Sequence, residues 1–179
     1  MMQPHQRAWI DQEDARIRDM ICRHGWAIEY IGGGECSAPG CDGGDDDGPA
    51  FGYTVGMFGL GHDELLVFGF DAHDTAGLLN SIGDTVQDGE TILPGHGLTV
   101  GNWPHQIIPE QVPNPGDIVY SANRFYRRLD RHSLDVLRLS LHHRDPFDRL
   151  LLAQAQIEDL HLATADPVFS LYTEPLLTP

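Results

Sequence analysis

Three cysteines and a nearby histidine are side chains whose types could together bind a metal ion. Cys22 and His24 lie close together, and Cys36 and Cys41 follow in a glycine-rich stretch. Thiolates and imidazoles are usual ligands of zinc, but structural zinc sites place them in closely spaced pairs. These spacings match no common zinc pattern and no second ligand pair follows. We therefore interpret the cysteines as structural or incidental.

Other residue types with possible chemistry also lack the spacing that their chemistry needs. The run Asp45, Asp46, Asp47 could hold a hard cation, but it lacks the spaced ligands and terminal glutamate of an EF-hand loop. The ten histidines include no zincin-type pair with a glutamate. The glycines at 32–34 match no phosphate or dinucleotide loop, and no serine lies in a G-x-S-x-G turn. We interpret these features as structural or as solvated surface.

Charge and length limit the class of protein. The 179 residues suit one domain, or a domain with a short appendage. Eleven Lys and Arg against 27 Asp and Glu give a formal net charge of −16, which disfavours general binding to nucleic acid, although a local arginine cluster could still act. No apolar run is long enough to span a bilayer, and the N-terminus lacks the apolar stretch of a signal peptide. We expect a cytoplasmic protein with free thiols and no membrane partner.

The elements that position these residues are clearest in the first half of the chain. Apolar periodicity predicts a helix over 8–24 that Gly25 ends, and a second helix from an Asp71 cap to about Gln87. Branched and aromatic residues predict strands, the last of them buried on both faces, over 26–31, 50–58 and 64–70. The segment 32–49 is glycine-rich and acidic, which predicts a long loop.

The sequence patterns in the second half of the chain are shorter and less regular. We expect short strands at 97–102 and 105–110, and 118–128 is compatible with helix or strand. A short helix is predicted over 130–139, then a connector, then a strong helix over 146–158 with Asp145 as its cap and Pro146 at its first position. A short strand at 160–164 and a further helical piece follow. The pattern predicts an α+β protein, a compact mixed sheet with flanking helices followed by a helix–strand–helix tail.

The first part of the chain resembles the family catalogued as domain of unknown function number 4262. The resemblance extends from about residue 11 to 128 and is carried by HGWAIEYI, PAFGYTVGMFGLGHDELLVFGF and LLNSIGDTVQDGE, in that order. Members usually have Pro-Glu-Leu where this chain has Asp63, Glu64 and Leu65. The resemblance implies an α+β fold and no established activity. We place a first domain at 8–128 and a partial second segment at 129–174.

The second segment resembles the C-terminal half of PIN-domain ribonucleases of the VapC toxin type. The stretch HHRDPFDRLLLAQAQIEDLHLATADPVFSLY, within 131–172, carries this resemblance. PIN nucleases hold Mg²⁺ or Mn²⁺ with three or four acids. By motif, the resemblance implies that Asp148 and Asp166 are catalytic metal ligands and that Asp145 caps the helix. Hard divalent ions prefer such oxygen ligands, which activate water through the metal.

The same resemblance predicts that the metal site is incomplete. Asp148 falls in the first turn of its predicted helix and Asp166 follows a strand, and both places suit a carboxylate. The first acid of a PIN domain follows an opening strand, however, and the nearest acids of this kind here are Glu35 and Asp71, of which Asp71 is better explained as a helix cap. Two carboxylates alone bind Mg²⁺ weakly, because the ion sheds its water reluctantly.

Three functions are compatible with this pattern. The first is a non-catalytic cytoplasmic binding or interaction protein without a cofactor, which we favour. The second is a Mg- or Mn-dependent ribonuclease of the VapC type, completed by other acids or by a second subunit. The third is a fusion remnant without independent activity. A homodimer or an antitoxin-like protein is the partner that the VapC resemblance implies.

Overall fold

The computed structural model describes residues 3–32, 50–101, 105–128, 132–143, 154, 162–163 and 176–177. The helices are α1 (Pro4–His24), α2 (Ala72–Gln87) and α3 (Tyr120–Phe125), with short 3-10 helices η1 (Met57–Leu60) and η2 (Pro115–Asp117). The strands are β1 (Ala27–Ile31), β2 (Phe51–Val55), β3 (Glu64–Phe68), β4 (His105–Gln111), β5 (Val136–His143), β6 (Leu162–Ala163) and β7 (Leu176–Leu177). The mixture confirms the predicted α+β class.

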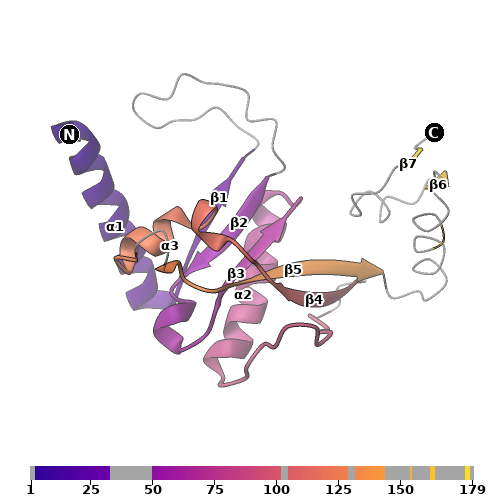
Figure 1. Cartoon of the computed structure of the whole chain (residues 1–179). Helices are drawn as coiled ribbons and strands as arrows, with labels where there is room; N and C mark the ends of the chain where they lie inside the picture. Colours follow the sequence, from indigo (N-terminus) through magenta and orange to yellow (C-terminus); the bar gives the residue numbers. More distant parts are fainter. Residues whose placement is uncertain are drawn as a thin grey trace.

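Five strands form one mixed sheet in the order β1-β2-β3-β5-β4 (Figure 1). β1 pairs antiparallel with β2, and β2 pairs antiparallel with β3. β3 and β5 run parallel, with Glu64 opposite Val136, and β5 pairs antiparallel with β4 over its whole length. Because β3 and β5 are distant in sequence, the two halves of the sheet are joined by its only parallel pair among the described strands. β1 and β4 are the edges.

Helices cover both faces of this sheet. α2 packs on one face, where its buried residues join Leu65, Val67 and the inner residues of β4 and β5. α1 and α3 lie on the opposite face, where Ile17 and Ala122 pack against Leu66 and its neighbours (Figure 1). Successive residues of β3 therefore point into two different cores. This confirms the prediction that the strand is buried on both faces.

Local chemistry explains where the two long helices begin and end. The Asp71 carboxylate accepts a hydrogen bond from the Asp74 N–H at 2.8 Å, which caps α2 as predicted. α1 starts at Pro4, four residues before the predicted start, and ends at Gly25. Gly25 has a φ of +94° and donates its N–H to the Ile21 carbonyl at 2.8 Å, which suits a residue without a Cβ.

The predicted helix over 130–139 is wrong, because residues 136–143 form β5 in the interior of the sheet. The described residues of the predicted connector that follows it, 139–143, are also part of β5. Pairing with β3 and β4 on either side outweighs the local helical pattern, since it buries Val136, Leu137 and Leu139. The sheet therefore continues beyond the predicted domain boundary at residue 128.

Three other segments differ from or refine the sequence-based expectations. The predicted strand 50–58 stops at Val55, and its end forms η1. The ambiguous segment 118–128 contains α3. Of the predicted strand 97–102, only a single bridge from Leu98 to Ile107 forms within the described part of this segment.

α3 is held to the chain just before β5 by a side-chain amide. Asn123 Oδ1 accepts the Leu134 N–H at 3.0 Å, and Asn123 Nδ2 donates to the Ser133 hydroxyl at 2.9 Å. On the other side, Arg124 binds the Asp14 carboxylate of α1 at 2.8 Å. These contacts hold α3 in place, although at six residues it is too short to be stable alone.

The described residues of the tail are few. β6 and β7 form a separate parallel pair, and β6 lies within the predicted strand 160–164. Gln154, from the predicted helix 146–158, is helical. The rest of that helix and the predicted loop from 33 to 49 lie outside the described residues. The helices that the structure describes are too short or too polar to cross a membrane.

Candidate functional site

The acids that the sequence predicts as metal ligands, Asp148 and Asp166, lie outside the described residues, as does the predicted cap Asp145. The metal site therefore stays a prediction. Within the described ranges, no group of three or more His, Cys, Asp or Glu side chains could hold a metal ion.

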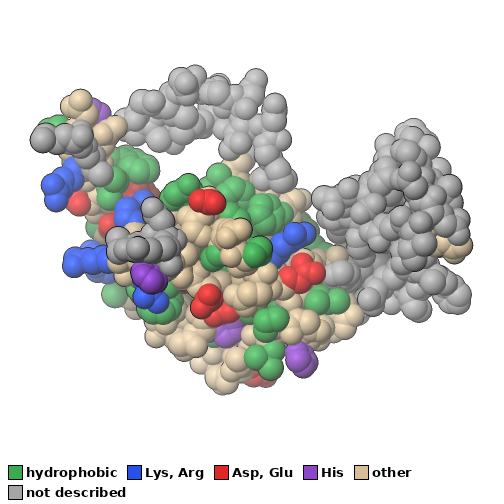
Figure 2. Space-filling model, viewed as in Figure 1, with side chains coloured by type: hydrophobic (Ala, Val, Ile, Leu, Met, Phe, Trp, Pro, Cys, Tyr) green, Lys and Arg blue, Asp and Glu red, His purple; other side chains and the backbone are tan. Residues whose placement is uncertain are grey.

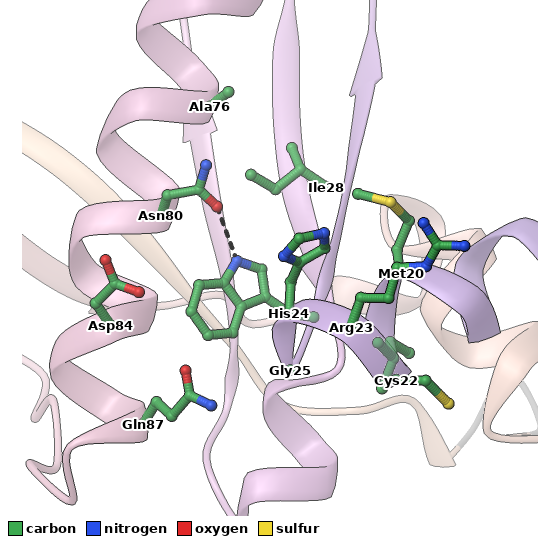
Figure 3. Close-up of a pocket in the computed structure, with 12 residues that line it drawn as sticks. Met20, Cys22, Arg23, His24, Gly25, Ile28, Ala76, Asn80, Asp84 and Gln87 are labelled. Carbon is green, nitrogen blue, oxygen red and sulfur yellow. Dashed lines mark hydrogen bonds between the residues drawn. The ribbon is translucent and has the colours of Figure 1, made fainter.

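Cys22 and His24 are both exposed at the end of α1. Cys36 and Cys41 lie outside the described residues. A cysteine acts as a nucleophile when a base such as histidine contacts its thiol. Among the described contacts no hydrogen bond joins Cys22 to His24, and the sulfur and the ring point in different directions (Figure 3). The pair is not arranged as a nucleophile and its base.

A groove of about 900 Å³ lies between the end of α1, the start of β1 and the outer side of α2 (Figure 3). It follows the β1 edge of the sheet. Its α1 wall runs from Met20 to Gly25, its floor includes Trp26 and Ile28, and its α2 wall holds Ala76, Asn80, Asp84 and Gln87. Volumes of about 300 to 1,000 Å³ are usual for small-molecule sites. The groove thus has the size of a ligand site.

The floor of the groove is a fixed indole ring. Trp26 is only 4% exposed, and its Nε1–H donates to Asn80 Oδ1 at 3.0 Å. The ring fits against Gly83 of α2, where an added Cβ would lie 2.6 Å from a ring carbon. A side chain at position 83 would displace the indole, so glycine is required there for this packing.

The α2 wall presents a row of polar groups. Asn80, Asp84 and Gln87 are spaced four and three residues apart, which places them on one side of the helix. The Trp26 bond uses the Asn80 carbonyl, so its amide N–H groups remain available as donors at the groove. Gln87 lies near Gly25, 3.5 Å from where a Cβ would stand. Asp84 is exposed and has no ion pair with any described residue.

The α1 wall carries one permanent cation, Arg23. Arg23 and His24 occupy its last turn, where a cation is favoured by the carbonyl end of the helix. Arg23 is held by Asp19 of the same helix, with a 3.0 Å bond from its Nε. The groove therefore has a cation on its α1 wall, and an acid and two amides on its α2 wall. The apolar floor lies between the two walls. Such a surface can bind a polar ligand and contains no arranged catalytic pair among the described residues.

A second unusual group, the Glu64 carboxyl, is fully buried at the turn between β2 and β3. Its Oε2 accepts the Thr54 hydroxyl at 2.7 Å and the Met57 N–H at 3.2 Å. Its Oε1 accepts the N–H groups of Gly56 and Phe58 at 2.9 and 3.2 Å. Burial raises the pKa of Glu64, and these four donors oppose that effect.

Glu64 has a structural role because its bonds are all to the turn itself. It supplies acceptors for the N–H groups at the start of η1, which have no partner within the short helix. Burial, and then the charge of Glu64, raises the pKa of the neighbouring Tyr126 hydroxyl. Sequence reasoning missed this role, although an acid that opens a strand buried on both faces was the available signal.

His62, two residues before Glu64, has both ring nitrogens occupied. Nε2 accepts the Ile92 N–H at 3.0 Å, so the proton lies on Nδ1, which contacts the Asp63 carbonyl at 2.7 Å. The ring thereby ties the β2–β3 turn to the segment after α2. Its role is to join these two segments, since neither nitrogen is left for a substrate.

Comparison with known protein families shows which family the chain belongs to. A family profile described as Domain of unknown function (DUF4262) matches residues 20–147. The chain belongs to this family. The DUF4262 match includes β1 to β5, the whole groove and Glu64, and it extends past the predicted boundary at 128. Asp148 and Asp166 lie beyond it, and the PIN resemblance stays a prediction.

No curated protein and no solved structure was found that matches the chain. The function of the DUF4262 domain is therefore inferred from its own geometry.

Proposed function

We propose that this DUF4262 domain is a non-catalytic binding domain that holds a small polar ligand in the groove between α1, β1 and α2. The observation that carries the proposal is the Trp26 floor with hydrogen-bonding groups on both walls. Because the indole is already fixed by Asn80 and Gly83, little side-chain order is lost when a ligand stacks against the groove.

The wall chemistry sets the class of ligand. Asn80 offers N–H donors, Asp84 offers an acceptor and Arg23 offers a cation, so a ligand with both a donor and an acceptor group fits best. An apolar portion of the ligand would rest on Ile28 and Trp26. A small molecule with an amine or amide at one end and a carboxylate at the other fits this arrangement.

A groove-filling variant tests the proposal. Ala76 lines the groove, whereas its neighbour Gly77 has open space where a Cβ would stand. Ala76→Trp should fill the groove, and Gly77→Trp places the same ring on the outside of α2. A library of small polar fragments is screened against both variants and the wild type by saturation-transfer NMR.

We expect fragments that bind the wild type and Gly77→Trp and that are lost in Ala76→Trp. The absence of any such fragment, or equal binding to Ala76→Trp, would refute a ligand site in the groove. The non-catalytic part is tested by incubating the full chain with a panel of RNAs and Mn²⁺. Cleavage that Asp148→Asn abolishes would show a nuclease instead.

A further inference from the structure

A continuous line of stacked side chains runs across the face of the sheet opposite to α2. The Arg18 guanidinium lies over the Phe125 ring at 5.9 Å, and Phe125 packs edge-on against Tyr126 at 5.1 Å. Tyr126 packs against Phe58 at 4.9 Å, and Arg128 lies over Phe58 at 5.0 Å. We call these five residues the arginine–aromatic surface. It joins α1, η1 and the end of α3.

The two arginines at its ends lack acidic partners, unlike three other arginines of α1 and α3. Arg16 and Arg124 are ion-paired with acids of α1 and β1, and Arg23 binds Asp19. Within the described residues, Arg18 and Arg128 have no such pair, and both are exposed. Figure 2 shows basic side chains, with acidic ones among them, over α1 and α3 on this face. In a chain of net charge −16, Arg18 and Arg128 are therefore cations that no described acid neutralises.

The geometry that places Arg128 carries backbone strain. Arg127 has a φ of +54°, the left-handed region that favours glycine, at a cost of about 1 to 2 kcal/mol for other residues. At this turn the chain folds back toward α3, and the Arg128 N–H donates to the Asn123 carbonyl at 2.7 Å. The side chain of Arg128 then covers the Phe58 ring. Strain of this kind is held by its surroundings and is common at binding sites.

Apolar side chains are exposed beside these cations. Phe58 and Leu60, both in η1, are each 43% exposed. Arginine, phenylalanine and tyrosine are enriched at the centres of protein interfaces, where aromatic rings supply apolar contact and arginine binds carboxylates in a two-bond geometry. Because the rings already stack on one another, the surface is ordered before a partner arrives.

We infer that the arginine–aromatic surface docks an acidic segment of a partner protein, with its carboxylates on Arg18 and Arg128 and an apolar side chain against Phe58 and Leu60. A protein is favoured over a nucleic acid for two reasons. The net charge of −16 repels a strand with a charge on every nucleotide more strongly than a segment with a few carboxylates. The exposed apolar side chains of η1 fit an aliphatic or aromatic residue.

The test uses the full chain and a phage-displayed library of random peptides. We expect selected peptides to combine Asp or Glu with an apolar residue. A fluorescein-labelled peptide of the enriched sequence is then titrated with protein by fluorescence anisotropy. The double variant Arg18→Ala, Arg128→Ala should weaken its binding by about tenfold or more, as loss of central interface residues does.

Arg138 provides a matched control, since it is exposed and lies over the Phe68 ring at 5.8 Å on another part of the sheet. Arg138→Ala should change the affinity by less than about twofold. A charge exchange gives a measurement that misfolding cannot imitate. The double variant Arg18→Glu, Arg128→Glu should abolish binding of the acidic peptide, and a peptide with lysine in place of its acids should bind this variant.

Three results would overturn the inference. The first is enrichment of peptides without acidic residues, and the second is equal loss of binding in Arg138→Ala. The third is binding of a labelled single-stranded RNA, sensitive to the Arg18 and Arg128 substitutions, in the absence of peptide binding. Because no groove residue is changed, these results are separate from those that test the proposed ligand site.

Discussion

The buried Glu64 carboxyl allows one substitution to be followed atom by atom. Glu64→Gln keeps the shape of the side chain but replaces one acceptor oxygen by an NH₂ group, which has no lone pair to offer. If the NH₂ group takes the Oε1 position, the N–H groups of Gly56 and Phe58 lose their acceptor. If it takes the Oε2 position, the Met57 N–H and the Thr54 O–H lose their acceptor, although the Thr54 oxygen can accept from the new amide.

Each orientation leaves two donors without their acceptor, but the Thr54 hydroxyl of the second can rotate, so the cost is at least that of one buried N–H without a partner. Such a group costs about 1 to 3 kcal/mol, and we expect Glu64→Gln to lower the free energy of unfolding by about 2 kcal/mol. Glu64→Leu removes every acceptor and should cost more. Thr54→Ser, which keeps both hydroxyl contacts with Glu64 and the Leu65 N–H, should cost less than about 1 kcal/mol.

The difference in stability between the wild type and Glu64→Gln also depends on pH, since glutamine does not ionise. Burial raises the folded pKa of Glu64 above its ordinary value of 4.5. Below that value this carboxyl is protonated in both the folded and the unfolded wild type. As pH rises from there towards the raised pKa, the unfolded chain loses its proton first, so the wild type loses stability. The cost of Glu64→Gln should therefore be largest at low pH and shrink as pH rises.

Urea unfolding followed by circular dichroism at several pH values measures these free energies. The reasoning would be refuted if Glu64→Gln lay within about 0.5 kcal/mol of the wild type, well below the cost of a buried unpaired donor. It would also fail if Thr54→Ser were as damaging as Glu64→Leu, because that serine keeps the hydrogen bonds.

Three further predictions concern helix packing, strain and capping. Gly83→Ala should destabilise the protein by about 1 to 3 kcal/mol, because the methyl group overlaps the Trp26 ring, and it should reduce fragment binding in the groove. Gly77→Ala, in the same helix with open space around it, should stabilise by up to about 1 kcal/mol. Arg127→Gly should be neutral or stabilise by up to about 1 kcal/mol as the strained φ is relieved. Asp71→Ala should cost about 1 kcal/mol through loss of the α2 cap.

Thermal and urea unfolding of the purified variants check all three. Equal effects of alanine at positions 83 and 77 would contradict the packing of Trp26 on α2. A loss of more than about 1 kcal/mol in Arg127→Gly would contradict the assignment of strain, since strain relief should offset the loss of the side chain. An unchanged Asp71→Ala would show that the cap contributes nothing to the stability of α2.

The parts of the fold that the sequence predicts well are those fixed by local chemistry. α2 has a capping aspartate and a regular apolar stripe, and β3 is a short run of branched and aromatic residues. The segment 136–143 was missed because its state depends on β3, about seventy residues earlier in the chain, and on β4. Its own residues favour neither helix nor strand strongly, and pairing on both sides decides the outcome.

The candidate groove could not be predicted for a similar reason. Trp26 and Asn80 are separated by 54 residues, and each is unremarkable in its own segment. Only the packing of α2 beside β1 brings them together. Sequence motifs drew attention to the acids at 148 and 166 instead, because a motif is local and a groove built from three elements is not.

The place of β5 between β3 and β4 has a consequence for the order of folding. As the chain leaves the ribosome, β1, β2, β3 and α2 can assemble early, because their contacts are local. The inner edge of β3 then waits for a strand that is synthesised much later, and β4 cannot join the sheet without it. During that interval an apolar edge is open to the strands of other nascent chains. Truncation before residue 136 would make the interval permanent and should yield aggregated protein.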